Sequence, residues 1–426
     1  MDILKYCCLL FLAFTIGCNS GINQETKLNF EKDDGGITLP DGFQAIVVAK
    51  NIGAGRHITT APNGDIYMAL SELHNGNGIA ALRDNDEDGK AETVKYFGNQ
   101  TGTGIQVHSG YLYFGSDTSI VRYQMTDGKL IPEADPETVV GGFATQQQHA
   151  VKPFTFDRSG NIYVNIGAPS NACQQQMRTP GSAGMDPCPQ LKNHGGIWQF
   201  SATETGQTFQ KDGQRYATGI RNSVALDWNL NVNELYVAQH GRDQLHSLWS
   251  DYYTTKENAE QPAEELFRVN KGDNFGWPYT YYNWKKEQKM KAPEYGGDGE
   301  TPAEKGKYEN PIMAFSGHWA PNDLVFYNGS QFSGKYKNGA FIAFHGSWNR
   351  APEPQQGYKV VFVPFDGPTP SGDYKEFADG FAGKDSLQSP RKAQYRPMGI
   401  AQYKDGSLLI SDSQEGKIWR IVYTGN

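Results

Sequence analysis

Residues 154–167, FTFDRSGNIYVNIG, decide the fold class of this chain. An apolar segment comes first, a turn containing Asp, Gly and Asn follows, and a second segment rich in Ile, Tyr and Val completes the unit. Gly, Asn and Asp tolerate the positive φ angles that tight turns require. The pattern therefore predicts a β-hairpin.

The same unit recurs along the chain. Clear copies lie at 58–70 (ITTAPNGDIYMAL), 224–241 and 400–412 (IAQYKDGSLLISD), and weaker copies lie at 105–117 and 324–346. Repetition of one hairpin unit is typical of propeller blades. Six copies predict an all-β fold, a six-bladed β-propeller, although six hairpins can also form a sandwich or a barrel.

The composition agrees with an all-β protein. The 426 residues include 49 Gly, and 12% are aromatic, which favours strands and turns over helices. The net charge of -8 makes nucleic acid an unfavourable partner, because phosphate binding needs a basic surface. Locally concentrated Arg residues in an acidic chain fit a small anionic ligand better.

The N-terminus has the pattern of an export signal. Residues 6–17 are apolar and follow Lys5, and this run is too short to span a membrane but suits a signal-peptide core. It ends in Thr15-Ile16-Gly17-Cys18, which resembles a bacterial lipobox. We therefore expect a lipoprotein signal peptide over 1–17 and a lipidated Cys18. A plain signal peptide with an incidental Cys is the alternative.

The rest of the chain is then expected to form one domain behind a tether. Residues 18–37 are polar and predict a flexible tether from Cys18, and 38–426 predict a single propeller domain. The protein would be held at the bacterial cell envelope, facing the periplasm or the surface, and would touch the membrane only through lipid. Two insertions, 168–196 and 250–310, are expected to be loops on the ligand face.

Two of the five cysteines remain once the leader and the lipidated residue are set aside. Cys173 and Cys188 form an even pair in an exported domain, which predicts a disulfide. A metal site is the alternative, but two further ligands at suitable spacing are missing.

Polar residues gather at the strand ends between 216 and 278. The segments are YATGIRN (216–222), LYVAQHGRDQL (235–245) and GDNFGWP (272–278). They resemble the soluble pyrroloquinoline quinone (PQQ) dependent sugar dehydrogenases, the glucose/sorbosone dehydrogenase family. The segments GHWAP (317–321), HGSWNR (345–350) and YRP (395–397) resemble its sorbosone-dehydrogenase-like branch.

The resemblance runs from about Leu39 to Tyr423 and implies a six-bladed propeller. It implies a quinoprotein that oxidises a sugar, or a related hydroxyl or aldehyde, by hydride transfer to PQQ in the presence of Ca²⁺. Electrons would pass to a separate acceptor. The chain has no Gly-rich dinucleotide fingerprint and no Cys-x-x-Cys-His motif, so NAD and covalently attached haem are not indicated.

The resemblance also implies roles for individual residues. His149 would be the general base, and Arg221 would contact the quinone oxygen that gains negative charge. Asn222 and His240 would contact the cofactor. The backbone carbonyls of Gly241 and Arg242 would bind Ca²⁺, for which carbonyl oxygens are suitable ligands.

Two further arginines are candidates for binding the cofactor's carboxylates. PQQ is a tricarboxylate, and Arg350 and Arg396 would hold it in a channel lined by Trp and Tyr. The pattern departs from the glucose-oxidising relatives at one position. They place an Asp that orients the catalytic His after Ile-Gly, whereas Ile166-Gly167 is followed here by Ala168.

An acidic turn offers a second, weaker calcium site. Asp84, Asp86 and Asp88 alternate before Gly89, as in the first half of a calcium loop, but position twelve of an EF-hand would be Lys95. A bare solvated turn is the alternative. For the whole protein, a non-catalytic carbohydrate- or partner-binding propeller and a metal-dependent lactonase-like hydrolase remain alternative functions.

Overall fold

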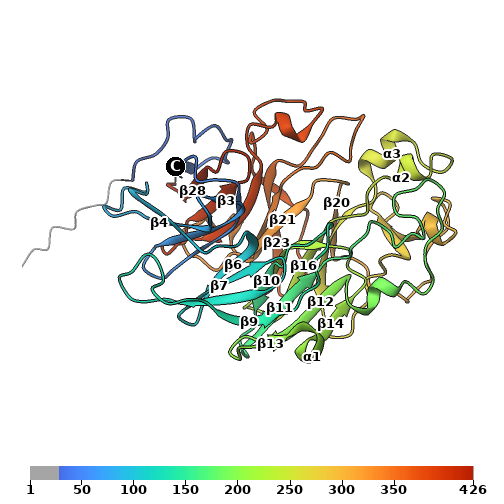
Figure 1. Cartoon of the computed structure of the whole chain (residues 1–426). Coiled ribbons are helices and arrows are strands. Elements are labelled where there is room, and N and C mark those ends of the chain that lie inside the picture. The colour runs from blue at the N-terminus through green and yellow to red at the C-terminus, as the bar shows by residue number, and fades with distance from the viewer. Residues whose placement is uncertain (1–27, 426) are drawn as a thin grey trace, which may run out of the picture.

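A computed structural model describes residues 28–425 and confirms the six-bladed β-propeller (Figure 1). In five blades the strands follow one another from the channel outwards. These blades are β2 (Gly55–Thr60), β3 (Ile66–His74), β4 (Asn77–Arg83), β5 (Thr93–Phe97); β6 (Gly102–His108), β7 (Tyr111–Ser116), β8 (Ile120–Gln124), β9 (Glu137–Gly141); β10 (Phe154–Phe156), β11 (Asn161–Ile166), β12 (Gly196–Ser201), β14 (Gln214–Thr218); β15 (Ser223–Asn229), β16 (Glu234–Gln239), β17 (Glu264–Val269), β20 (Met313–Phe315); and β21 (Pro321–Phe326), β22 (Gly339–Phe344), β23 (Lys359–Asp366), β25 (Lys375–Ala378).

The sixth blade closes the ring by joining the two ends of the chain. It contains β26 (Pro397–Gln402), β27 (Leu408–Asp412) and β28 (Ile418–Tyr423), and its outer strand is the N-terminal β1 (Phe43–Ala49). β1 pairs antiparallel with β28, so residues far apart in sequence share one sheet. The remaining strands are β13 (Gln207–Thr208) beside β9, β24 (Thr369–Pro370) beside β23, and the hairpin β18 (Thr280–Asn283) and β19 (Gln288–Lys291).

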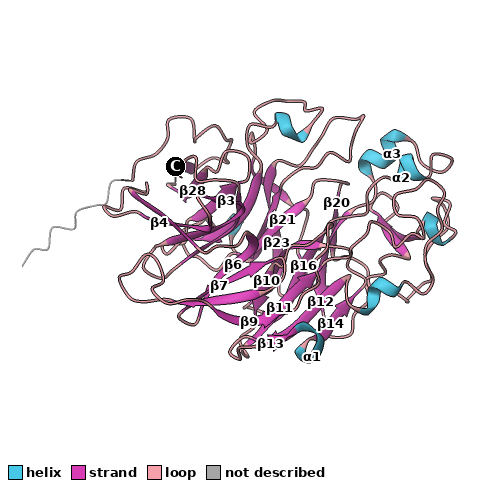
Figure 2. Ribbon diagram, in the orientation of Figure 1, coloured by secondary structure: helices cyan, strands magenta, loops and turns pink. Residues whose placement is uncertain are grey.

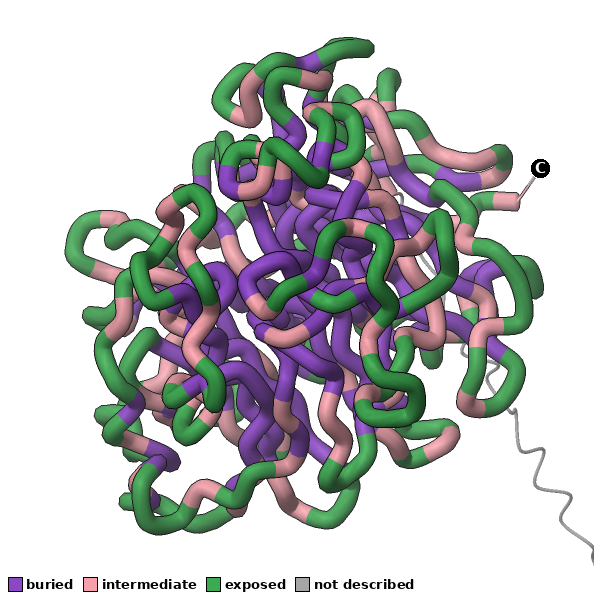
Figure 3. Tube along the Cα trace, turned by 90° about the vertical axis from the view of Figure 1, so that its right-hand side faces the viewer, coloured by how far each residue is buried: buried purple, intermediate pink, exposed green. Residues whose placement is uncertain are grey.

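All six hairpins expected from the sequence are present. Each forms the two innermost strands of one blade, and 154–167 becomes β10 and β11. The apolar faces of neighbouring blades pack on each other in six clusters, one between each pair of blades. Figure 3 shows buried strands in the middle and exposed loops around them. The periodic apolar pattern therefore determines both the strands and the packing between blades.

Helices are short and lie outside the blades (Figure 2). The α-helices are α1 (Phe209–Asp212), α2 (Leu245–Leu248) and α3 (Thr255–Glu260), and the 3-10 turns are Pro189–Lys192, Pro293–Tyr295, Gly334–Tyr336 and Pro390–Lys392. α3 begins with a capping box between Thr254 and Glu257. Within residues 28–425 we find no helix that is long and apolar enough to cross a membrane.

The two expected insertions pack against each other at one side of the propeller. The Gly184 N–H donates to the Glu294 carbonyl at 2.8 Å, and the Cys188 N–H donates to the Tyr279 hydroxyl at 2.9 Å. The second insertion is not continuous, however. β17 lies inside 250–310 and is the third strand of its blade, so this range contains two loops and a strand.

The signal peptide, Cys18 and the first part of the expected tether lie outside the described residues. Residues 28–37 are described, and they contact the propeller. The Glu31 N–H donates to the Ala45 carbonyl at 2.9 Å, and the Asn29 N–H donates to the Asp88 carbonyl at 2.8 Å. The described part of that segment is therefore packed on blades and does not form a free linker.

Candidate active site at one end of the channel

Two adjoining cavities lie where the chain enters the inner strands. The base cavity is lined by His149, Arg221, His240, Gly241, Asp243, Glu264, His318, Ala320, Ser347 and Asn349. The cation cavity is lined chiefly by Arg56, Asn222, His240, Asn322, His345, Trp348 and Arg396. His240 lines both cavities, so the two form one continuous site.

His149 is held in an unusual backbone conformation at the edge of the base cavity. Its φ is 53°, in the left-handed region that non-glycine residues rarely adopt. The amide of Gln146 stabilises this turn by donating to the carbonyls of Gln148, His149 and Gly167 at 2.6–3.0 Å. The strain is therefore supported by three hydrogen bonds to the main chain.

The imidazole of His149 is oriented by a main-chain carbonyl. Nδ1 lies 2.6 Å from the carbonyl oxygen of Ala168, and because a carbonyl can only accept, Nδ1 carries the proton. Nε2 is then the unprotonated nitrogen and is available to accept a proton. Burial, and next the charge of Arg221, lower the pKa of His149 to about 3, so the ring is neutral at physiological pH.

The missing Asp after Gly167 is explained by this geometry. The Ala168 side chain is fully buried in a small apolar cluster with Cys173, Cys188 and Trp277, so it is the carbonyl that faces His149. Gly167 is required for the close approach, since a Cβ there would lie 2.5 Å from the Cβ of His149. The orienting group is therefore the backbone.

Arg221 is bound on three sides. Its Nη2 donates to Asp243 Oδ2 at 2.8 Å, Nη1 donates to the Gly241 carbonyl at 2.9 Å, and Nε donates to the Asn171 carbonyl at 3.2 Å. Burial alone would raise the pKa of Asp243, but the opposing charges, Arg221 first among them, hold it well below its usual range. Asp243 is thus a carboxylate that fixes the guanidinium in the cavity.

The base cavity also contains oxygen atoms that suit a hard cation. Gly241 and Ala320 donate their N–H groups to Glu264, at 2.8 and 3.0 Å, which fixes that carboxylate beside the cavity. Burial raises the pKa of Glu264 to about 7. Asn349 Oδ1 is buried and has no hydrogen-bond partner among the described residues. Carbonyl, amide and carboxylate oxygens together match the ligands of Ca²⁺, and a cation on the Gly241 carbonyl would share it with Arg221.

The side chains of two expected site residues, Arg242 and Arg350, point to partners outside both cavities, while the expected Ca²⁺ contact of Arg242 concerns its backbone carbonyl. The guanidinium of Arg242 is buried and paired with Glu294. Arg350 is also buried and donates to the main-chain carbonyls of Ala259, Gly317 and Pro354. Their side chains therefore connect loops to one another, and neither is among the residues that line the site.

The cation cavity carries positive groups that lack acidic partners. Arg56 donates to Thr103 Oγ1 at 2.9 Å, and Arg396 donates to the His345 carbonyl at 3.1 Å and to His345 Nδ1 at 2.8 Å. Within residues 28–425, neither guanidinium forms a salt bridge with a carboxylate. Burial is the main cause that lowers the pKa of Arg56 to about 10; Asp117 opposes this shift and the charge of Arg396 adds to it. The cavity is therefore prepared for an anion.

The two tryptophans expected near the ligand have different roles. Trp319 is 7% exposed and packs edge-on against Phe344, so it belongs to the core. Trp348 is 55% exposed and lines the cation cavity. Asn222, as expected, also lines this cavity.

The acidic turn lies between β4 and β5, outside the channel. Carboxylate oxygens of Asp84, Asp86, Asp88 and also Glu92 lie within 4.8 Å of one another. Asp84 Oδ1 has no hydrogen-bond partner among the described residues, and burial raises the pKa of Asp84. The three expected residues are thus brought together, with Glu92 as a fourth member that the sequence pattern had not suggested.

Sequence reasoning did not find Arg56, Glu264 or Asn349 as site residues. A signal for Arg56 exists, because a guanidinium lies at or just before the start of three inner strands, at Arg56, Arg221 and Arg396. Glu264 begins a strand inside the range 250–310, which the sequence predicts to be a loop insertion. Nothing in its local sequence indicates the cavity.

Comparisons with known proteins agree with the fold. The model of a family described as TrAA12-like matches residues 37–424. A PQQ-dependent pyranose dehydrogenase from Coprinopsis cinerea is 23% identical over 90% of this chain and 54% of its own length. An uncharacterized protein from Borreliella burgdorferi is 33% identical over 49% of this chain and 48% of its own length. The chain thus spans about half the length of these relatives.

Solved structures share the fold at low identity. The calcium structure of the Trichoderma reesei enzyme of carbohydrate-active family AA12 superposes with a TM-score of 0.74 at 17% identity, over 93% of this chain and 98% of that one. The holo PQQ domain of the Coprinopsis cinerea pyranose dehydrogenase gives 0.70 at 18% identity, with the same coverage. Both are propellers of the same overall course as this chain.

Proposed function

Because this chain belongs to the TrAA12-like family, we propose that it is a quinoprotein dehydrogenase that oxidises a sugar, or a related hydroxyl or aldehyde compound. The observation that carries the proposal is the cation cavity. Arg56 and Arg396 face it without carboxylate partners among the described residues, beside Arg221 in the adjoining base cavity. A small polycarboxylate would supply the missing negative charge, and the names of the relatives in Coprinopsis cinerea point to PQQ.

The residues present fit this cofactor. Arg56 and Arg396 would hold its carboxylates, Asn222 would donate a hydrogen bond, and Arg221 would face the oxygen on which negative charge develops. When bound, PQQ supplies the acceptor for the hydride. Gly241, with the oxygen atoms of Glu264 and Asn349 that line the same base cavity, would hold Ca²⁺.

His149 would remove the proton from the substrate hydroxyl. Its Nδ1 proton is donated to Ala168, so the lone pair on Nε2 is available to a substrate in the base cavity. Because the low pKa keeps the ring neutral, the base is in its active form throughout the neutral range. Arg221 stays charged and fixed by Asp243, so it needs no rearrangement as the charge develops.

Reconstitution tests the proposal. Purified protein is incubated with PQQ and Ca²⁺, and PQQ binding is followed by quenching of tryptophan fluorescence. Dye reduction is then measured with aldoses, pyranoses and sorbosone. We expect binding at or below micromolar PQQ and turnover with at least one sugar. Failure to bind micromolar PQQ would remove the proposal.

A metal-dependent hydrolase is the second candidate, because the carboxylates of Asp243 and Glu264 line the same cavity. Asp243 is already engaged by Arg178 and Arg221, so Glu264 is the one carboxylate among the lining residues that is left for a metal, whereas a hydrolytic centre needs several converging carboxylates. Lactone hydrolysis with Ca²⁺ and without PQQ would favour this candidate. If the protein binds a sugar but catalyses neither reaction, it is a binding propeller.

A further inference from the structure

The segment 168–171 contacts both catalytic elements of the proposed site. At its start, the Ala168 carbonyl accepts the Nδ1 proton of His149, and the Ala168 N–H donates to the Arg221 carbonyl at 2.7 Å. At its end, the Asn171 carbonyl accepts from Arg221 Nε at 3.2 Å. One short segment therefore sets the relative position of the expected base and the expected cation.

Asn171 uses its whole side chain on one neighbour. The residue is fully buried, its Oδ1 accepts from the Asp243 N–H at 2.8 Å, and its Nδ2 donates to the Asp243 carbonyl at 2.9 Å. The amide thus holds the backbone of Asp243 at both of its polar atoms. Since the carboxylate of Asp243 binds Arg221, Asn171 reaches the guanidinium by two routes, its own carbonyl and Asp243.

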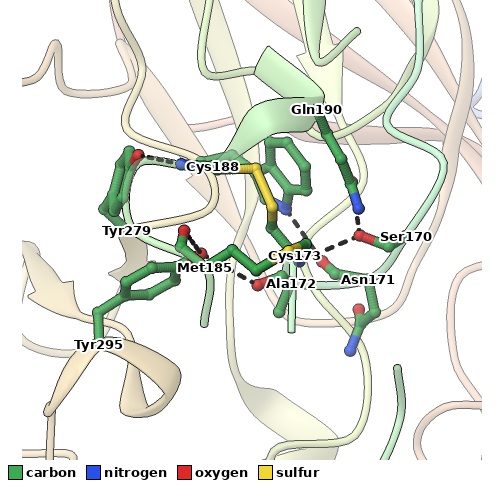
Figure 4. Close-up of a disulfide and its surroundings, with 10 residues drawn as sticks. Ser170, Asn171, Ala172, Cys173, Met185, Cys188, Gln190, Tyr279 and Tyr295 are labelled. Atoms are coloured by element: carbon green, nitrogen blue, oxygen red, sulfur yellow. Dashed lines mark hydrogen bonds between the residues drawn. A yellow bond between two sulfur atoms is a disulfide. The ribbon is translucent and has the colours of Figure 1, made fainter. Parts of the chain in front are cut away.

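The segment is anchored by the disulfide loop. Cys173 and Cys188 form the expected disulfide, with an S–S distance of 2.01 Å. Figure 4 shows Asn171 beside it, with the Ser170 hydroxyl accepting from the Cys173 N–H at 3.0 Å and donating to Gln190 at 2.7 Å. The Trp277 indole donates to the Asn171 carbonyl at 2.9 Å. The first insertion is therefore a rigid support on which the site is built.

We propose that Asn171 is a positioning residue that acts through Asp243 and Arg221, so that the disulfide-closed loop sets the geometry of the cofactor contact. This inference rests on the proposed function. Removing the amide would leave the buried Asp243 N–H without its partner and the Asp243 carbonyl with only the long hydrogen bonds from Arg242, at 3.3 and 3.4 Å, so the backbone of Asp243 would shift to recover hydrogen bonds. The Arg221 guanidinium would move with its carboxylate partner.

The test measures PQQ affinity, by quenching of tryptophan fluorescence with Ca²⁺ present, in the wild type and in Asn171→Ala. We expect the Kd for PQQ to rise by about tenfold, the effect of losing roughly one well-placed hydrogen bond. The same substitution in an Arg221→Lys background should change the Kd by less than about twofold, because residues that act as a unit are not additive. If Asn171 served stability alone, Asn171→Ala would raise the Kd for PQQ by the same factor in the wild-type and Arg221→Lys backgrounds.

Asn229→Ala is the matched control. Asn229 is also a buried Asn, 3% exposed, whose Oδ1 accepts one backbone N–H, but it lies at the opposite end of β15. The Asn229→Ala substitution should lower the unfolding midpoint and leave the Kd for PQQ unchanged. If Asn171→Ala does not fold, Asn171→Asp keeps the Oδ1 acceptor but replaces the donor to the Asp243 carbonyl by a charged acceptor oxygen, and it should weaken PQQ binding in the same direction.

The outcomes separate the inference from its premise. A wild-type protein that does not bind PQQ would overturn the proposed function and this inference with it. A wild type that binds PQQ, together with folded Asn171 variants of unchanged Kd, would overturn the inference alone. An equal loss of affinity in both Arg221 backgrounds would also overturn it.

Discussion

The two ends of the central channel are both polar, but their polar groups are satisfied differently. The inner strands run from the cation and base cavities to a third cavity, the far-end cavity, which all six of them line. Its polar members include His57, Thr59, Thr155, Asp227 and Asp323. At the far end the ionisable groups are mainly carboxylates. At the ligand end most of them are guanidinium and imidazole groups, and the carboxylates are those of Asp243 and Glu264.

The far-end side chains join neighbouring blades. Asp227 Oδ2 accepts from the Phe326 N–H at 2.8 Å, and Asp323 Oδ2 accepts from the Ile400 N–H at 2.7 Å. Thr155 accepts from the Trp228 N–H at 3.3 Å in the same manner. Each of these bonds links one inner strand to the next, so this end of the channel serves the fold.

The ligand end also has such a bond, from Arg56 on β2 to Thr103 on β6, but several of its polar groups lack, in the described part of the chain, partners of opposite charge or any partner. Arg56 and Arg396 lack carboxylate partners within residues 28–425, and Asn322 Oδ1 is buried there without a partner. A buried polar group without a partner is costly unless a ligand or water completes it. The comparison therefore distinguishes polar residues that stabilise the fold from those that could bind a ligand. Substitutions at matched positions of the two ends test this distinction.

Replacing the base should have the largest effect. We expect His149→Ala to lower kcat by about 10²- to 10⁴-fold, the usual contribution of general-base catalysis, while PQQ affinity changes little. Steady-state dye reduction and fluorescence quenching measure the two quantities. A His149→Ala protein with normal kcat would show that another group removes the proton.

His57 is the matched control for His149. Its Nε2 lies 2.7 Å from the Asn322 carbonyl, and burial lowers its pKa to about 4, so it is also a buried neutral histidine. Because it lines the far-end cavity, His57→Gln should lower the unfolding midpoint and leave kcat within about threefold of the wild type. A large loss of kcat would show that the two ends are functionally coupled.

Removing an unpaired cation should have the next largest effect. Arg396→Ala deletes a charge that faces the cation cavity, and we expect the Kd for PQQ to rise by about 10- to 100-fold. Fluorescence quenching measures it. Arg350→Lys provides the contrast, because Arg350 donates to main-chain carbonyls outside the cavities and should affect stability more than affinity. Equal losses of affinity would contradict the assignment of the cavity.

The sequence predicts the scaffold better than the site. Alternating apolar residues and turn residues such as those at 154–167 act locally, so all six inner hairpins could be found. Short motifs beside those hairpins, through their resemblance to a known family, predicted His149, Arg221 and Arg396, and the structure places all three beside the two cavities. Glu264 reaches the cavity from the first position of β17 and Asn349 from the loop after β22, and their directions are set by contacts distant in sequence that no local pattern encodes. Arg350 has a suitable motif, yet its direction is decided by carbonyls distant in sequence.

The smallest expected effect concerns Asp227 at the far end, and its sign depends on pH. Burial raises the pKa of Asp227 from 3.8 to about 7, although three hydrogen bonds to it oppose the shift. Between these values the folded state binds the proton more tightly than the unfolded chain does. The contribution of Asp227 to stability is therefore most favourable below pH 4 and becomes unfavourable as the pH rises to 7.

Asp227→Asn removes this titration. We measure the free energy of unfolding of Asp227→Asn and of the wild type by denaturant titration at pH 5 and at pH 8. The value for Asp227→Asn minus the value for the wild type should be larger at pH 8 than at pH 5 by about 1 to 2 kcal/mol. Comparison with the wild type is needed because His57, whose pKa is lowered, gives the opposite slope in the acidic part of this range. Asp405→Asn is the control, because the pKa of Asp405, which is paired with Arg420, is lowered below 3.8, so that the carboxyl does not titrate between these two pH values. It should lower stability equally at both. A pH-independent difference for Asp227→Asn would mean that the hydrogen bonds from Trp228 and Phe326 outweigh burial, and that the far end holds its carboxylates charged.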